Sequence, residues 1–247
     1  MIQQLKITIA TARRILLQLM HDPRTIVLMI GAPVLLMWLL SWVFSDTKQV
    51  FDHIAPALLG VFPFVIMFLV TSITTLRERT SGTMERLMAM PVNKFSIIAG
   101  YALAFGIIGA AQSVIVSTFA VYVLAMDTAG PQWFMILVAI ADTLMGVALG
   151  LLVSAFARTE FQAVQFMPAL IFPQFLVCGL LVPLDKLPDL LEKIAYCLPL
   201  TYAVDALNGV VNNTTITAEM WRDVEAIIGF SIVALLLASM TLRRRSA

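Results

Sequence analysis

The chain has 247 residues, of which 60% are apolar and 13% are charged, and its formal net charge is +1. A soluble domain carries about half apolar and about a quarter charged residues, so this composition excludes an ordinary soluble domain and indicates an all-α membrane protein. Because there are only two cysteines, Cys178 and Cys197, a framework of several disulfide bonds is excluded, although the sequence allows one disulfide bond between them.

Residues 1–24 are predicted to form an amphipathic helix. Apolar residues recur on one face, whereas Lys6, Arg13 and Arg14 lie on or near the other. A basic helix of this kind lies in the headgroup plane, here at the cytoplasmic surface. A solvated lead-in to the first span is the alternative. The segment lacks the apolar core and cleavage site of a signal peptide, so we expect the mature chain to keep it.

Residues 25–247 are predicted to form one transmembrane domain with six helices. Each apolar segment is close to the about 20 residues that a helix needs to cross a bilayer. The predicted spans are residues 25–44, 56–76, 97–125, 133–157, 165–183 and 226–242. The fifth contains Pro168, Pro173 and Pro183, which membrane helices tolerate where neighbouring groups satisfy the freed carbonyl groups.

The basic residues set the expected orientation. With six spans and an inner N-terminus, twelve lysines and arginines lie on the inner side, and four lie on the outer side: Lys48, Lys186, Lys193 and Arg222. The positive-inside rule then places both termini in the cytoplasm. We expect a multi-pass protein of a bacterial cytoplasmic (inner) membrane.

No pattern in the sequence predicts catalysis or a metal site. His21 and His53 have no second ligand at a suitable spacing, and no glycine is followed by lysine, so a phosphate-binding loop is excluded. No nucleophile is paired with a base. If energy drives this protein, the nucleotide site must lie on another chain.

The predicted inner loop, residues 77–96, has the most informative pattern. Gly82 permits a tight turn, Thr83 can cap a helix, and Glu85 complements the dipole of its first turn. A short helix over residues 84–90 should end at Pro91. Its apolar residues, Leu87, Met88 and Met90, have no obvious core to bury them. A docking element and an ordinary topology-setting loop fit this pattern equally well.

The predicted outer stretch, residues 184–225, combines an apolar stripe with charged residues and prolines. Two short re-entrant helices that dip into the outer leaflet fit this pattern, because irregular backbone at that depth leaves polar groups unpaired. Such helices could gate the exit of a substrate. A loop that lies on the surface is the alternative.

Asp142 is the only carboxylate that we place deep in a span. A carboxylate there costs roughly 2.5–3.5 kcal/mol on insertion scales, so it usually faces a cavity or a polar partner. A position in the outer third of the helix, where hydration is easy, is slightly favoured. Gly146 and Gly150 on the same helix predict close helix packing.

The segment from Arg77 to Leu87, Arg-Glu-Arg-Thr-Ser-Gly-Thr-Met-Glu-Arg-Leu, followed by Pro91, resembles the coupling segment of ABC-2 type permeases. These are transmembrane subunits of ABC exporters of the daunorubicin-resistance and nodulation-export kind. The runs from Val182 to Pro188 and from Leu198 to Leu207 resemble the family signature before the last span. Leu198 departs from the frequent asparagine, and Asn208 from the frequent arginine.

This resemblance implies a permease subunit that exports a hydrophobic drug, an antibiotic or a lipid-like compound. The chain itself would be no enzyme and would bind no cofactor, since ATP and magnesium bind to a separate ATPase. Two ATPase copies would assemble with two copies of this chain. The other expected partners are membrane lipid and the substrate, and nucleic acid is not one.

The resemblance also points to three groups of site residues. The ATPase-coupling positions are Glu78, Arg79, Gly82, Thr83, Glu85 and Arg86. Side chains available to a substrate path between two copies are Trp38, Trp42, Phe172, Gln174 and Phe175. The outer-gate positions are Pro183, Pro188, Pro199, Tyr202 and Asp205. For the second group, an ordinary lipid-facing surface is the alternative.

A secondary transporter that uses an ion gradient, with Asp142 as its carrier, is the competing function. It would require internal repeats and broken helices at matching positions in both halves. The sequence contains no such matching pair.

Overall fold

A computed structural model of the chain describes residues 2–89 and 93–241, and this part is helical without strands. Pro91 and the basic residues Arg243 to Arg245 lie outside the described residues. The elements are α1 (Ile2–Met20), α2 (Pro23–Val43), α3 (Lys48–Thr80), α4 (Thr83–Ala89), α5 (Lys94–Tyr122), α6 (Gln132–Val153), α7 (Glu160–Val177), the 3-10 helix η1 (Leu184–Lys186), α8 (Asp189–Ala195), α9 (Pro199–Asn212) and α10 (Ala218–Thr241).

Five of these helices, α2, α3, α5, α6 and α10, are long and apolar enough to cross a membrane. The number rises to six if α8 and α9, which meet at 91°, form one span. The prediction of an all-α, multi-pass membrane protein is therefore confirmed. The two short helices expected before the last span are present as α8 and α9, and their depth in a bilayer stays a prediction.

The predicted fifth span, residues 165–183, corresponds to α7, which is not among those five helices. The Thr159 side chain accepts a hydrogen bond from the Gln162 amide at 3.1 Å, so the helix begins in a polar stretch. It ends before Gly179, whose φ of +90° lies in the left-handed region. The local backbone therefore ends the helix six residues before the predicted boundary.

Helix α3 is longer than the predicted second span. It runs for 33 residues, although Pro56 and Pro63 lie inside it. A helix of this length extends about 50 Å, which exceeds the about 30 Å of a hydrocarbon core. Arg77, Glu78 and Arg79 therefore belong to the same continuous helix as the membrane-crossing segment.

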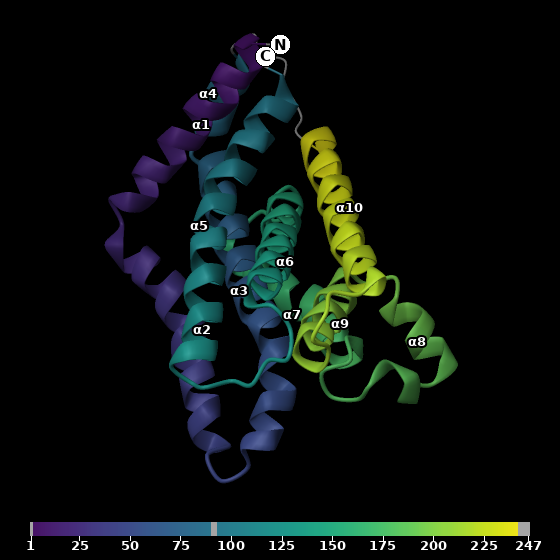
Figure 1. Cartoon of the computed structure of the whole chain (residues 1–247). Coiled ribbons are helices and arrows are strands. Elements are labelled where there is room, and N and C mark those ends of the chain that lie inside the picture. Colours follow the sequence, from purple (N-terminus) through teal and green to yellow (C-terminus); the bar gives the residue numbers. More distant parts are fainter. Residues whose placement is uncertain (1, 90–92, 242–247) are drawn as a thin grey trace.

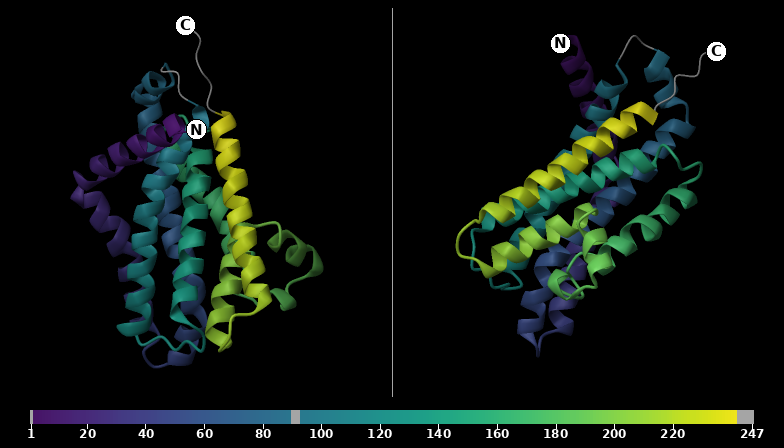
Figure 2. Two further views of the ribbon diagram at one scale, coloured as in Figure 1. Left: turned by 45° about the horizontal axis from the view of Figure 1, so that its top comes forward. Right: turned by 90° about the vertical axis from the view of Figure 1, so that its right-hand side faces the viewer.

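Helices α3, α5, α6 and α10 run side by side, whereas α1 lies at an angle beside one end of the bundle (Figures 1 and 2). Helix α4 lies at the same end, which we call the α4 end. The opposite end, here the far end, holds the turn between α2 and α3, and η1 and α8 project from the bundle near it (Figure 1).

Helix α6 occupies the centre and packs against α3, α5, α9 and α10. Its close approach to α3 depends on two glycines, because a Cβ on Gly146 would lie 2.5 Å from the Phe64 carbonyl oxygen, and one on Gly150 would lie 2.6 Å from the Phe68 carbonyl oxygen. The predicted packing role of these glycines is confirmed. Cys178 and Cys197 are free thiols, so the single bridge left open by the sequence does not form.

Candidate functional site

Glu78, on the last turns of α3, joins three helices at the α4 end. Its carboxylate accepts hydrogen bonds from Arg14 of α1, with Nη1–Oε1 and Nη2–Oε2 distances of 3.1 and 2.8 Å. The hydroxyl of Tyr101, on α5, donates to Oε2 at 2.5 Å and accepts from Arg14 Nη2 at 3.0 Å. The Glu78 side chain is only 11% exposed, so it faces the protein interior and not a free surface.

The pairing requires α1 to lie close to α5, and Gly100 allows this. A Cβ on Gly100 would lie 2.6 Å from Thr11 Cβ and 2.9 Å from the Thr8 carbonyl oxygen. The Ser96 hydroxyl donates to Gln4 Oε1 at 2.6 Å, and the Thr8 hydroxyl donates to the Ser96 carbonyl at 3.2 Å. Polar and small residues therefore hold α1 against the first turns of α5.

The apolar face predicted for α1 is only partly buried. Ala12 and Leu19 are buried, but Leu5, Ile9 and Met20 are exposed. The protein-facing side of α1 includes the polar residues that contact α5, and this rotates the apolar stripe partly away from the bundle. An exposed apolar stripe on a basic helix suits a position at a membrane surface, which stays a prediction.

Gly82 forms the turn between α3 and α4 with a φ of +77°, as its position in the sequence predicts. Helix α4 then begins at Thr83, whose hydroxyl hydrogen-bonds with that of Ser81 at 3.1 Å. The apolar surface expected on this helix is partly covered, since Met84 is buried and Leu87 packs against a core cluster. Arg86 is exposed on α4, and the Glu85 side chain lies outside the described part of the structure.

Two further features surround this turn. Arg79 is half-buried and lines a cavity of about 420 Å³ beside Gly82 and Ser154. Arg77 donates from Nε and Nη2 to the two carboxylate oxygens of Glu160 at 2.6 and 2.8 Å, which links α3 to α7. Hydrogen bonding from Arg77 lowers the pKa of Glu160 from its ordinary value.

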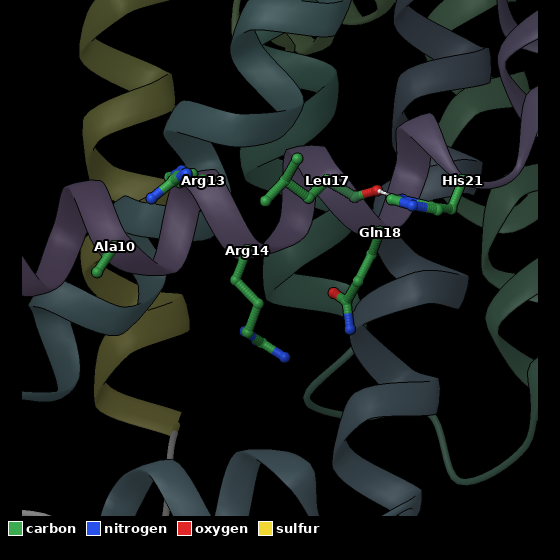
Figure 3. Close-up of a pocket in the computed structure, with 6 residues that line it drawn as sticks. All are labelled: Ala10, Arg13, Arg14, Leu17, Gln18 and His21. Atoms are coloured by element: carbon green, nitrogen blue, oxygen red, sulfur yellow. Dashed lines mark hydrogen bonds between the residues drawn. The ribbon is translucent and has the colours of Figure 1, made fainter.

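The exposed side of α1 borders an open cavity of about 720 Å³ (Figure 3). The lining side chains form one stripe of the helix: Ala10, Arg13, Arg14, Leu17, Gln18 and His21. Two arginines therefore lie on the rim of this cavity, and the guanidinium group of one of them, Arg14, reaches Glu78.

At the far end, two of the five predicted gate residues line a third cavity, of about 340 Å³. Pro183 and Asp205 line it together with His53 of α3. Pro188 precedes α8 and Pro199 is the first residue of α9, as expected because the fixed φ of proline suits the start of a helix. The Tyr202 hydroxyl donates to the Tyr196 carbonyl at 2.7 Å, which ties α9 to the end of α8.

Asp142 is fully buried, so the preference for a hydrated position is wrong. Neither of its carboxylate oxygens has a hydrogen-bond partner in the described part of the chain. A Cβ built on Gly60 of α3 would lie 3.1 Å from Oδ2 and 3.0 Å from Leu207 of α9, so both helices close over the carboxyl group.

The family follows from a comparison with known proteins. Residues 6–211 match the sequence model of the family described as ABC-2 type transporter. The chain belongs to the ABC-2 type transporter family. In this ABC-2 chain, the segment that resembles the coupling motif therefore consists of the end of α3, the turn at Gly82 and α4.

Several curated relatives resemble this ABC-2 chain over part of their length. It is 26% identical over 167 residues to ABC transporter G family member 20 of Dictyostelium discoideum, covering 68% of the chain and 23% of that relative. It is 25% identical over 152 residues to the probable multidrug ABC transporter permease YbhR of Escherichia coli strain K12, and the match covers 62% of the chain and 41% of YbhR. It is 29% identical over 140 residues to the linearmycin resistance permease protein LnrN of Bacillus subtilis strain 168, and the match covers 57% of the chain and 36% of LnrN. The matched part spans less than half of each relative.

The structure does not bring the residues suggested for a substrate path together within one copy of this ABC-2 chain. Trp38 and Trp42 stack on α2 with ring centroids 5.4 Å apart, and both are exposed. Phe172 is exposed on α7 and Phe175 is half-buried, and α2 and α7 have no extensive contact. Gln174 is buried, and its amide group bonds to the backbone of Leu170 and Leu200.

The partners of Glu78 were not predicted from the sequence. The sequence assigned no role to Tyr101, and it placed Arg14 on or near the polar face of the amphipathic helix and among the inner basic residues. A tyrosine directly after Gly100, near the inner end of a span, was the available signal. A glutamate at a helix end facing a basic amphipathic helix is the second signal that could have suggested the pairing.

Proposed function

We propose that the chain is the permease subunit of an ATP-driven exporter, which moves an amphiphilic drug, an antibiotic or a lipid-like compound out across the cytoplasmic membrane. The main observation that supports this proposal is the cluster of Arg14, Glu78 and Tyr101. It joins the segment that resembles the coupling motif to an amphipathic helix and to a membrane-crossing helix. The names of YbhR and LnrN, a probable multidrug permease and a linearmycin resistance permease, support the choice of substrate class.

In this proposal, the α4 end faces the cytoplasm and receives a separate ATPase, which binds ATP and magnesium. Movement of α4 would pass through Gly82 to α3, which continues without a break across the membrane. The Glu78 cluster would make α1 and α5 move with the end of α3. The excess of lysine and arginine on this side of the predicted topology supports the orientation.

Two copies of the chain, with two ATPase copies, would form the complete exporter. The exposed aromatic residues of α2 and α7, Trp38, Trp42 and Phe172, would then line the path between the copies. The far-end cavity beside Pro183 and Asp205 would serve as the exit, with α8 and α9 as its gate.

The first test is purification of the tagged protein from its native host in mild detergent. We expect a stoichiometric ATPase that carries a phosphate-binding loop. The exposed Arg86 of α4 provides a directed test, since Arg86→Glu should lower ATPase recovery. Lys193→Glu, the same reversal on exposed α8 near the far end, is the matched control and should retain it.

Two outcomes would contradict the proposal. One is a preparation that lacks an ATPase even after gentle crosslinking, which would favour transport driven by an ion gradient. The other is equal ATPase recovery with the Arg86 and Lys193 variants, which would remove α4 from the docking surface.

A further inference from the structure

Asp142 lies where three helices meet, in apolar surroundings. It belongs to α6, and Gly60 of α3 and Leu207 of α9 cover its carboxyl group. The hydroxyl group of Thr143, the next residue on the same helix, is already engaged, since it donates to the Ala139 carbonyl and pairs with Ser113 of α5. No described residue supplies a hydrogen bond to Asp142.

An ionised carboxylate in these surroundings would be strongly unfavourable. A buried charge without a partner loses its hydration and gains nothing in return, so the group takes up a proton instead. The enclosed arrangement is therefore compatible only with a neutral Asp142. Ionisation requires water or a cation to reach the carboxyl group, and this requires the covering helices to separate.

A polar cavity lies close to this site, toward the far end. His53, which lines the cavity of about 340 Å³, is seven residues before Gly60, so it lies on the same face of α3 about 10 Å away. On α9 the cavity is lined by Val204 and Asn208, the sequence neighbours of the residues that pack over Gly60 and Asp142. The α3–α9 contact that covers Asp142 therefore borders this cavity.

Among the described helices around Asp142, no charged group hydrogen-bonds to its carboxyl group. Asp205 of α9 and His53 of α3 line the cavity, while the ionisable residues of α5 are Lys94 and Tyr101, near the α4 end, and Tyr122, its last residue. The other ionisable residues of α3 lie in its first and last turns: Lys48, Asp52, Arg77, Glu78 and Arg79. Those of α10 lie in its first two turns: Glu219, Arg222, Asp223 and Glu225. The Cys178 thiol, buried after α7, lines the same cavity as Asp205 and His53.

We propose that Asp142 is a proton-binding site that keeps the α3–α9 contact closed when protonated and favours its opening to the far-end cavity when ionised. Closing the contact takes up one proton, and opening it releases one proton to water in the cavity. Alkaline conditions therefore favour the open arrangement. The equilibrium belongs to this chain alone, so it can be measured without the partner ATPase.

Cys178 provides the probe, because it lines the cavity yet has no exposed surface. The experiment uses the full chain with Cys197→Ser in lipid nanodiscs and measures alkylation of Cys178 by a small maleimide at several pH values. Each rate is divided by the rate for the same thiol in the denatured chain at that pH, and all pH values lie well below the ordinary thiol pKa of about 8.5, so both thiols titrate in parallel and the ratio reports opening alone. We expect the normalised rate to rise with pH by up to about tenfold per pH unit, since one proton is linked to opening.

Asp142→Asn and Asp142→Leu should both abolish this pH dependence. The leucine variant suits the apolar site and keeps the test decisive if the asparagine variant does not fold. Asp189→Asn removes an exposed carboxylate on α8 and should keep the wild-type dependence. The proposal is overturned if both Asp142 variants retain that dependence, or if Cys178 stays equally protected at every pH. Either result would leave ATPase recovery, the test of the exporter function, unaffected.

Discussion

Arg14 and Glu78 lie 64 residues apart in the sequence and form a two-point ion pair between α1 and α3. Glu78 belongs to the segment that resembles a coupling motif, yet its carboxylate faces another part of the same chain. A glutamate in this position can transmit movement between helices without contacting the proposed ATPase partner. In the proposed exporter, Glu78 would therefore serve the internal linkage, and the exposed Arg86 is the candidate for direct contact with the ATPase.

Removing one partner of the pair should destabilise the docking of α1. Exposed pairs contribute up to about 1 kcal/mol, and breaking a buried pair costs about 3–5 kcal/mol. Glu78 is nearly buried and Arg14 is 30% exposed, so we expect Glu78→Gln to cost about 1–3 kcal/mol. The thermal midpoint should fall by about 2–4 °C for each kcal/mol.

A double-mutant cycle of Arg14→Met and Glu78→Gln isolates the pair from the other effects of each change. The coupling energy should exceed about 0.5 kcal/mol. Arg13→Met, the adjacent exposed arginine, is the control and should leave the midpoint near that of the wild type. Strictly additive losses would show that the ion pair does not hold α1 in place.

Gly100→Val should displace α1 from α5. Even a single Cβ at this position would lie 2.6 Å from Thr11 Cβ and 2.9 Å from backbone, which cannot move without shifting the helix. A disulfide between cysteines placed at Gln4 and Ser96, whose side chains hydrogen-bond, reports the contact. We expect its yield to fall in the variant. Gly31→Val, where nothing lies within 4 Å of the added atom, should retain the yield.

Gly82→Val should abolish export while membrane insertion is retained. A β-branched residue is strained at a φ of +77°, whereas asparagine tolerates this region better, so Gly82→Asn should keep more activity. Space does not limit this position, because nothing lies within 4 Å of a Cβ on Gly82. Drug accumulation in cells, together with the amount of protein in the membrane fraction, measures both effects. Equal export by Gly82→Val and Gly82→Asn would show that export does not depend on the left-handed backbone conformation at residue 82.

The Arg77–Glu160 pair should stabilise the α3–α7 contact at pH values above the ordinary pKa of a glutamate. This stabilisation should be lost in acid, when Glu160 is protonated. Hydrogen bonding from Arg77 lowers the pKa of Glu160, so the folded protein holds the carboxylate more strongly than the unfolded chain does. Both side chains are at least half-exposed, so the contribution should stay below about 1 kcal/mol. The difference in thermal midpoint between the wild type and Glu160→Gln should therefore shrink below about pH 4.

High salt should reduce the same difference at neutral pH, because exposed charges are screened. A difference that is independent of both pH and salt would indicate that packing, and not charge, links the two helices.

Local chemistry allowed the general architecture to be predicted. Long apolar segments require helices in a membrane, so the helical class and most of the spans followed from composition and length. The turn at Gly82, and the packing of Gly146 and Gly150, also follow from what a residue without a side chain permits. The fifth span was harder to predict, because the polar start of α7 and the turn at Gly179 shorten its apolar part.

The sequence by itself therefore determined the membrane class, the helices and the family resemblance, because these depend on residues close together in the chain. Only the tertiary structure decided that Glu78 meets Arg14 and Tyr101, and that Asp142 is buried. The first depends on the close approach of α1 at Gly100, and the second on α9 covering α6 opposite Gly60. Such contacts depend on how distant helices cross, and no local periodicity encodes the crossing.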